Sequence, residues 1–207
     1  MGNDVLERAK NIKDWLVDLR RDFHRHPEQS LKEYRTSKII TKNLIDMGIK
    51  VDHIGETGIV GILEGSSKGK VIALRADIDA LSVTEKTGLP FSSENIGYMH
   101  ACGHDFHASM LLGAAKLLSE KKDELKGTVK FLFQPAEEIA EGAKQMVQGG
   151  ALKNPDVDYI FGMHVWSDIS INKVSLQEGP IMASADIWKL KVLGKSCHGS
   201  SPWQGVD

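Results

Sequence analysis

Residues 99–107 have the sequence MHACGHDFH. Three of the chain's eight histidines and one of its two cysteines lie in this short stretch. An apolar, helix-forming run at 108–115 follows directly, so the cluster lies at the start of a predicted helix. Gly103 allows the backbone to turn between Cys102 and His104, which lets the thiol and the imidazole point at one centre. The stretch therefore predicts a chemical site at a helix entrance.

Three interpretations of Cys102 and His104 compete. The first is a buried cysteine beside surface histidines, which is common when such residues are isolated. The second is a nucleophilic pair, which needs the imidazole within hydrogen-bond reach of the sulfur. The third is metal ligation, because thiolate and imidazole are good ligands for zinc-like ions. The density of histidines disfavours the first interpretation, and two adjacent carboxylates downstream, Glu137 and Glu138, favour a metal over a nucleophile.

Helical and strand-like segments alternate on both sides of this stretch. Apolar periodicity predicts helices at 4–25, 35–47, 105–120 and 142–149, and strands at 59–63, 71–74, 128–133 and 159–165. The turn-forming residues 65–69 favour a hairpin between the first two strands. The pattern predicts an α/β fold with a mixed, mostly parallel sheet flanked by helices.

The pattern of apolar and polar residues changes after Gly179 and Pro180. Residues 185–192 alternate apolar and polar side chains, as a half-exposed antiparallel strand does. We therefore predict a domain boundary near residue 180, with residues 1–180 in the metal-binding domain and 181–207 beginning a second, α+β domain.

Further candidate residues follow predicted strands. Asp77 and Asp79 come after the strand at 71–74, the two glutamates come after the strand at 128–133, and His164 ends the strand at 159–165. Open α/β sheets place their ligands at the carboxyl ends of strands. Adjacent glutamates there point in different directions, so one can bind metal while the other faces substrate as a general base.

Taken singly, these residues have ordinary interpretations as well. A lone histidine at a strand end, such as His164, is more often structural, and Asp77 and Asp79 could bind metal, orient a ligand or cap a helix. On the sequence alone, His198 is no better than a surface-loop histidine. We predict that His24, His26 and His53 are surface residues, and His100 and His107 have no predicted role.

Composition excludes several classes of protein. The chain has 207 residues, a formal net charge of −2, 41% hydrophobic residues and 26% charged residues. Without a basic stripe we expect no nucleic-acid binding, and without a long apolar window we expect no membrane association. The charged N-terminus lacks the apolar run of a signal peptide, and two cysteines are too few for a disulfide framework. The expected location is therefore cytoplasmic.

Six motifs in a fixed order give the chain a family resemblance. They are FHRHPE (23–28), LRADIDAL (74–81), MHACGHD (99–105), FQPAEE (133–138), GMHV (162–165) and GKSCHGSSP (194–202). In this order and over essentially the whole chain, they resemble the aminoacylase/carboxypeptidase family of two-metal amidohydrolases. The branch they resemble most includes hippurate hydrolase, indole-acetyl-amino-acid hydrolases and N-acetyl-diaminopimelate deacetylase. The resemblance implies a zinc-exopeptidase-like fold.

The resemblance assigns roles by motif position. It implies Cys102, His104, Glu138 and His164 as ligands of two divalent metal ions, with Cys102 bridging them. It implies Glu137 as general base and later general acid. Asp77 would orient the site. His198 would help to stabilise the oxyanion, often across a dimer interface, so a homodimer is expected for the full-length protein.

The implied reaction is hydrolysis of the amide bond of a small N-acyl amino acid. Zinc or manganese is the expected metal, with cobalt or nickel as alternatives. The family inserts a lid domain near residue 180 and then returns to supply a last metal-binding histidine, so we expect a truncated chain with impaired activity. The alternatives are a metallo-dipeptidase or carboxypeptidase and a non-catalytic metal-binding fragment.

Overall fold

The computed structural model describes residues 2–184 and 188–206. The chain forms two compact units, Met1–Trp166 and Ser167–Asp207, and each is described by itself. The predicted division at residue 180, which concerns a lid domain, stays a prediction.

The first unit contains these elements in chain order: α1 (Gly2–Asn11), α2 (Lys13–Arg25), α3 (Tyr34–Asp46), β1 (Lys50–Ile54), β2 (Gly58–Glu64), β3 (Ser67–Asp77), α4 (His104–Ser119), the 3-10 helix η1 (Lys122–Glu124), β4 (Lys126–Gln134), α5 (Gly142–Gln148) and β5 (Tyr159–Gly162). The predicted helices at 35–47, 105–120 and 142–149 and the strand at 128–133 are confirmed within a few residues. The predicted helix at 4–25 is two helices that meet at Ile12. Arg8 of α1 donates to the carbonyl of Leu117 and pairs with Glu120, which fixes α1 on the end of α4.

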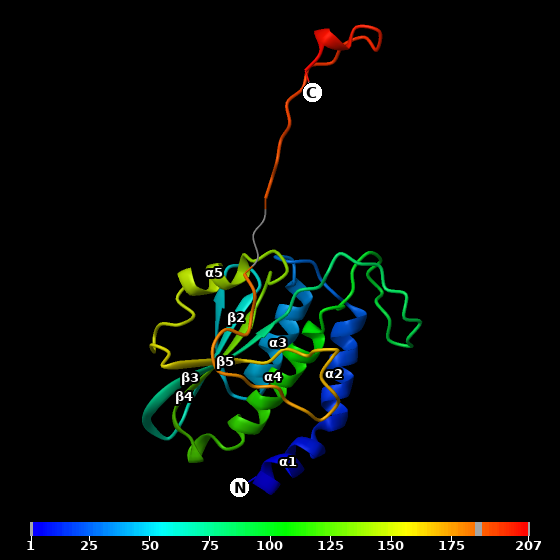
Figure 1. The fold of residues 1–207 in the computed structure, drawn as a ribbon. Helices are drawn as coiled ribbons and strands as arrows, with labels where there is room; N and C mark the ends of the chain where they lie inside the picture. Colours follow the sequence, from blue (N-terminus) through cyan, green and yellow to red (C-terminus); the bar gives the residue numbers. More distant parts are fainter. Residues whose placement is uncertain (1, 185–187, 207) are drawn as a thin grey trace. The chain divides into compact units, whose positions relative to one another are not determined.

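The five strands form one sheet in the order β1-β2-β4-β3-β5 (Figure 1). β3 pairs in parallel with β4 and β5, whereas β2 pairs antiparallel with β1 and β4. The mixed α/β fold is confirmed, but the sheet has as many antiparallel as parallel pairings. The predicted hairpin of β2 and β3 is wrong, because both strands pair with β4, which lies between them.

Glycines explain how the connection between β2 and β3 crosses the end of β4. The N–H of Gly65 donates to Gly127 O at 2.8 Å, and the N–H of Ser66 donates to Leu125 O at 3.0 Å. A Cβ on Gly65 would lie 2.4 Å from Leu125 O, and a Cβ on Gly127 would lie 2.1 Å from Lys70 O. Only glycine permits so close a passage of two backbones, so a turn that resembles a hairpin instead carries the chain over β4.

Hydrophobic side chains pack on both faces of the sheet. Phe131 and Phe133 of β4 point to the face covered by α2, α3 and α4, and Leu132 points to the face where Met146 of α5 packs. This alternation follows from the two-residue period of a strand. Lys130 shares the second face and is buried, with its Nζ donating to the carbonyls of Ala151 and Lys153. The sheet is thus held between helices, and its strand ends are left free to carry a site.

The second unit has little regular structure. Among its described residues, the 3-10 helix η2 (Pro202–Gln204) and an isolated bridge between Lys195 and Val206 are the assigned elements. The predicted strand at 185–192 begins on residues 185–187, which lie outside the described residues, and 188–192 is not a strand. A strand needs a neighbour for its N–H and C=O groups, and 188–192 has none here.

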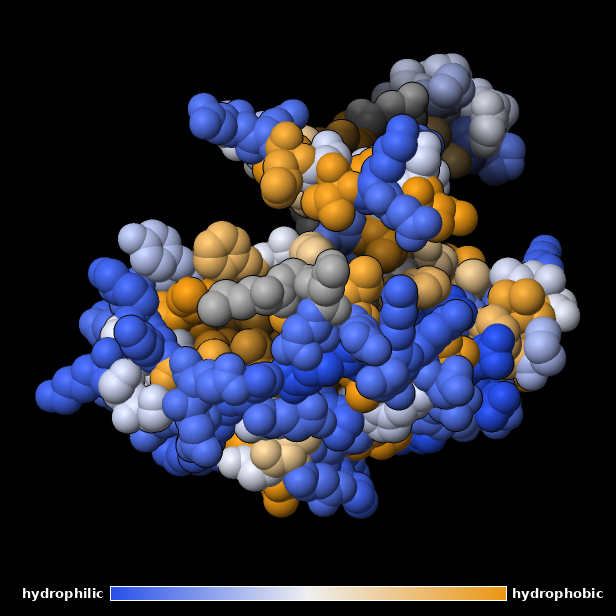
Figure 2. Space-filling view, turned by 90° about the horizontal axis from the view of Figure 1, so that it is seen from below, coloured by the Kyte–Doolittle hydropathy of each residue, from blue (hydrophilic) through white to orange (hydrophobic). Residues whose placement is uncertain are grey.

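Figure 2 shows one face, on which hydrophilic side chains predominate. Among the described residues, no helix is long and apolar enough to cross a membrane.

Candidate metal centre

Four segments meet at the carboxyl ends of the parallel strands. Asp77 of β3 is in register with Gln134 of β4, and Arg75 of β3 is in register with Gly162 of β5. The turn that follows β4 carries Glu137 and Glu138, the segment after β5 carries His164, and α4 begins at His104. The parallel register therefore gathers residues that are far apart in the sequence.

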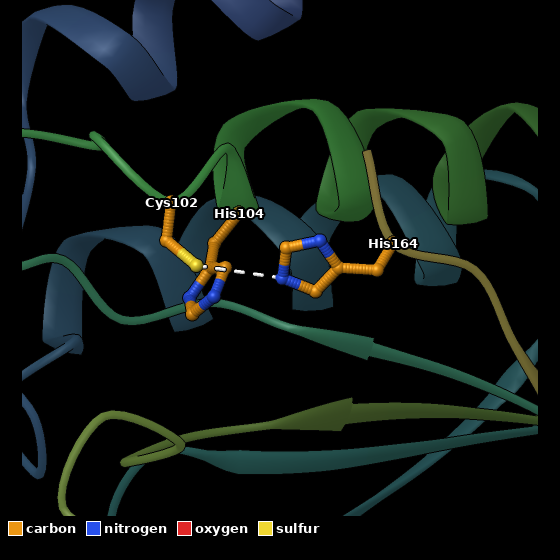
Figure 3. A group of neighbouring side chains, drawn as sticks. All are labelled: Cys102, His104 and His164. Atoms are coloured by element: carbon orange, nitrogen blue, oxygen red, sulfur yellow. Dashed lines mark hydrogen bonds between the residues drawn. The ribbon is translucent and has the colours of Figure 1, made fainter. Parts of the chain in front are cut away.

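Cys102 and His104 lie side by side at the start of α4, and His164 points toward them from the opposite side (Figure 3). Cys102 Sγ lies 3.4 Å from His164 Nε2, and all three side chains offer ligand atoms within 4.8 Å of one another. Gly103 makes the turn possible because its φ is +90°, a value that L side chains rarely adopt. A Cβ there would also lie 2.4 Å from Val165 Cγ2.

His104 is the common member of three groups that could hold a metal ion. Besides the first, it belongs to one group with Glu137 and Glu138 and to another with Asp77 and His107. Its Nε2 lies 3.8 Å from Glu137 Oε2 and 3.8 Å from Glu138 Oε1. Its Nδ1 donates to the backbone oxygen of Asp79 at 2.9 Å, which leaves the Nε2 lone pair free in the neutral ring.

Two buried acceptors face each other in this group and have no donor. His104 Nε2 and Glu138 Oε1 lack a hydrogen-bond partner among the described residues. Buried polar atoms without partners are rare and costly in native proteins, and a cation between these two atoms would satisfy both. The donor set of thiolate, imidazole and carboxylate fits a divalent ion of the zinc type.

The electrostatics of the site favour positive charge. Burial raises the pKa of Cys102 to about 12, and the charges of Glu138 and Glu137 add to this effect. Burial likewise raises the pKa of Glu138. Burial alone would lower the pKa of His104, but the hydrogen bond to Asp79 and the charges of Asp77 and Asp79 raise it. A metal ion bound here would supply positive charge, and the groups that bind it would then be deprotonated.

Asp77 lies beside this site and is hydrogen-bonded to His107. Asp77 Oδ1 accepts from His107 Nδ1 at 2.6 Å, and Asp77 Oδ2 accepts from Arg75 Nη1 at 2.7 Å. His107 Nε2 accepts the N–H of Val165 at 2.9 Å, so His107 holds the residue next to His164. Burial would raise the pKa of Asp77, but the hydrogen bond from His107 and the charge of His104 hold it well below its usual range.

Asp79 is a second buried carboxylate beside the site. Its Oδ1 lies 3.3 Å from His104 Nδ1, and its Oδ2 accepts from Ser30 Oγ at 2.7 Å and from the N–H of Glu138 at 3.1 Å. The Asp79 side chain thus contacts the imidazole of His104 and the backbone N–H of Glu138, and these residues are two of the candidate ligands. Its place two residues after Asp77, just beyond the end of β3, was the signal for this, because α/β sheets hold their ligands at the carboxyl ends of strands.

The sequence assigned no role to His107 and placed His24 on the surface. His107 follows His104 by three residues and lies on the same side of α4, which is the signal that points to it. The surface prediction for His24 is wrong, because its Nδ1 bonds to Asp105 Oδ2 at 2.7 Å and the ring is buried. A carboxylate 81 residues away in the sequence stabilises the buried ring.

His198 lies in the second unit, which is described by itself. Its ring is exposed, and its Nδ1 lies 2.8 Å from Ser200 Oγ. Its predicted catalytic role stays a prediction, as do the ligand roles of Cys102, His104, Glu138 and His164 and the catalytic roles of Glu137 and Asp77.

The chain is similar to several known proteins. A thermostable carboxypeptidase 1 from Saccharolobus solfataricus is 45% identical over 99% of this chain and 53% of its own length. An N-acetyl-L-cysteine deacetylase from Bacillus subtilis is 43% identical over 100% of this chain and 51% of its own length. The crystal structure of the Bacillus subtilis YXEP protein, described as a dinuclear metal binding peptidase of the M20 family, matches with a TM-score of 0.79 and 46% identity. That match covers 83% of this chain and 48% of the YXEP chain.

The chain spans about half the length of the curated relatives it matches. The model of one family, described as Peptidase family M20/M25/M40, matches residues 73–192, which include every candidate residue described above except His198. The chain therefore belongs to peptidase family M20/M25/M40.

Proposed function

We propose that this protein hydrolyses the amide bond of small N-acyl amino acids in a metal-dependent reaction. One observation carries the proposal. The side chain of Glu137 is 38% exposed while its Oε2 lies 3.8 Å from the buried His104 Nε2. Its neighbour Glu138 is turned inward, with only 18% of its side chain exposed. This difference supports Glu138 as a metal ligand and Glu137 as the residue that reaches a substrate beside it.

A centre for two divalent ions is supported by the overlapping groups around His104 and by the dinuclear relative. In this proposal Cys102, His104, Glu138 and His164 would hold the ions. Zinc or manganese suits the mixed sulfur, nitrogen and oxygen donors, with cobalt or nickel as alternatives. When bound, such ions polarise the scissile carbonyl and lower the pKa of the attacking water.

In this proposal Glu137 transfers the protons of the reaction. Glu137 takes one proton from the attacking water as the water oxygen bonds to the carbonyl carbon. The same carboxyl gives that proton to the amine nitrogen as the C–N bond breaks, which releases a carboxylic acid and a free amino acid. Asp77 and His107 hold the segment that carries His164, and Asp79 orients His104.

Further parts of the proposal concern the second domain and the assembly. Residues 1–180 would form the metal-binding domain, and 181–207 would begin a lid that brings His198 to the developing oxyanion. The full-length protein would act as a homodimer in the cytoplasm, and the two unpaired cysteines suit a reducing compartment.

The test uses the purified chain loaded with Zn²⁺ or Mn²⁺ and a panel of N-acetyl and N-benzoyl amino acids. Glu137→Gln is expected to lower kcat by about 10²–10⁴-fold, the usual contribution of a general base, with bound metal unchanged. Metal binding with no turnover, or turnover unaffected by the substitution, would contradict the proposal and favour a non-catalytic metal-binding chain.

A second candidate function is peptide hydrolysis. The 45% identity to a thermostable carboxypeptidase favours it, and the same site chemistry would serve a peptide bond. The two functions can be distinguished by measuring kcat/KM for N-acyl amino acids and for dipeptides under the same conditions. Faster cleavage of the dipeptides would overturn our first choice.

A further inference from the structure

Glu33 is a fully buried glutamate outside the candidate ligand set. It lies just before α3, yet its side chain does not cap that helix. Instead, its Oε1 accepts two backbone N–H groups, from Leu31 at 2.9 Å and from Ala136 at 2.9 Å. Its Oε2 accepts the hydroxyl of Thr57 at 2.7 Å. One carboxylate thus joins three segments, and one of them leads to the candidate glutamates.

Both N–H groups that reach Oε1 belong to residues in a strained backbone conformation. Leu31 has a φ of +65° and Ala136 has a φ of +50°. Residues with a Cβ rarely adopt such values, and they persist only where the surrounding contacts hold them. Glu33 provides the contact that both residues need.

Ala136 directly precedes Glu137, so its conformation sets the direction in which the two glutamates leave the sheet. The turn is closed by the N–H of Gly142, which donates to Ala136 O at 3.1 Å. A Cβ on Gly142 would lie 1.6 Å from Pro135 O, so only glycine fits there. The turn is therefore held on one side of Glu137 by Glu33, at Ala136, and on the other side by Asp79, at Glu138.

We propose that Glu33 is a positioning residue that fixes the turn carrying Glu137 and Glu138 through its hydrogen bonds to Ala136 and Leu31. It acts through the backbone and not as a ligand, because its oxygens are occupied by the three donors. Removing its side chain releases Ala136 toward an ordinary negative φ and swings both glutamates away from His104. This inference rests on the proposed metal centre for its effect on metal binding, but not for its effect on the turn.

The test compares the wild-type chain with Glu33→Ala, Glu33→Gln and a control, Lys130→Met. Glutamine keeps an oxygen for the two N–H groups, and the Thr57 hydroxyl can accept from its amide group instead. Lys130→Met removes another buried charged side chain, one that bonds to the carbonyls of Ala151 and Lys153 and not to this turn. The control therefore separates loss of general stability from loss of the turn.

The first readout is amide hydrogen exchange at residues 136–141 of the metal-free chain. We expect at least tenfold faster exchange there in Glu33→Ala and no such change in Glu33→Gln or Lys130→Met. The second readout is Co²⁺ affinity, followed by the thiolate charge-transfer absorption. It should fall by about 10–100-fold in Glu33→Ala, as for other residues that orient ligands, and be retained in Glu33→Gln.

Unchanged exchange in Glu33→Ala overturns the inference, whether or not metal binds. If Glu33→Ala and Lys130→Met lose exchange protection at the turn and Co²⁺ affinity to the same extent, the inference is overturned as well, because the role of Glu33 is then only structural. If the wild-type chain binds no Co²⁺, the proposed metal centre fails, and the exchange data still decide the role of Glu33. Should Glu33→Ala not fold, Glu33→Asp, whose carboxylate is one methylene shorter, replaces it with the same criteria.

Discussion

His104 Nε2 lies 3.8 Å from Glu138 Oε1, and both atoms are buried with no hydrogen-bond partner among the described residues. Two acceptors at this distance repel each other unless a proton or a cation lies between them. Asp79 fixes both members, since it accepts from His104 Nδ1 and from the N–H of Glu138. The hydrogen bonds to Asp79 thus hold His104 Nε2 and Glu138 Oε1 in an arrangement that a positive charge between them would stabilise.

The turn at Gly103 gives a prediction about stability. Gly103→Ala should cost more than the backbone strain alone, because the new Cβ would lie 2.4 Å from Val165 Cγ2. Gly97 is the matched control, since its φ is also +90° and nothing lies within 4 Å of its Cβ position. Denaturant unfolding should show a loss of about 1–2 kcal/mol for Gly97→Ala, the cost of the left-handed conformation, and a larger loss for Gly103→Ala. Equal losses would show that the contact with Val165 is unimportant.

The Asp77–His107 pair gives a prediction about metal binding. Asp77→Asn replaces the acceptor of His107 Nδ1 by a neutral amide and weakens the hold on Val165. The affinity for Zn²⁺ or Co²⁺ should fall by about 10–100-fold, as is usual for partners that orient metal ligands. Asp52→Asn, on the exposed strand β1, is the control and should leave affinity unchanged. If both variants bind like wild type, Asp77 does not orient the site.

The buried pair of His24 and Asp105 should make stability depend on pH. The hydrogen bond that His24 donates to Asp105 raises the pKa of His24 against the effect of burial. Burial would raise the pKa of Asp105, but the hydrogen bond from His24 and the charges of His100 and Arg20 lower it. A raised histidine pKa gives stability that is complete below the unfolded value of about 6.5 and is lost as the pH rises through the folded value. A lowered aspartate pKa gives stability that is present above about 3.9 and is lost as the pH falls through the folded value.

The pair should therefore contribute most between about pH 4 and 6.5. His24→Gln should lower the free energy of unfolding by about 3 kcal/mol in this window, since it leaves a buried carboxylate short of a partner, and by less at higher pH. Unfolding of both proteins at about pH 5.5 and 8.5 measures the difference, with the exposed His53→Gln as control. A loss that is independent of pH would mean that His24 is neutral in the folded chain.

Some of the fold could be predicted from local sequence and some could not. The helix at 105–120 and the strand at 128–133 have strong apolar patterns, and the structure places both there. The order of the strands depends on which segments pair, and no local pattern shows that β4 lies between β2 and β3. The break at Ile12 likewise depends on where α1 meets α4, because no glycine or proline marks it.

The candidate site shows the same division. Motif position and strand ends pointed to Cys102, His104, Glu138 and His164, and the structure brings them together around His104. The residues that orient them were harder to find. Glu33 bonds to a residue 103 positions away, and His107 is paired with Asp77 by the packing of α4 on β3. Such hydrogen-bond partners are brought together by the tertiary structure, so they can be identified only as candidates from a single sequence.

Metal content per chain, measured on the wild type and on Cys102→Ser after reconstitution with Zn²⁺, tests the central claim most directly. The account predicts about two ions per wild-type chain, as in two-metal sites, and a large loss in Cys102→Ser because the Cys102 thiolate is one of the proposed ligands. Absence of bound metal in the wild type, or equal binding in the two proteins, would contradict the account.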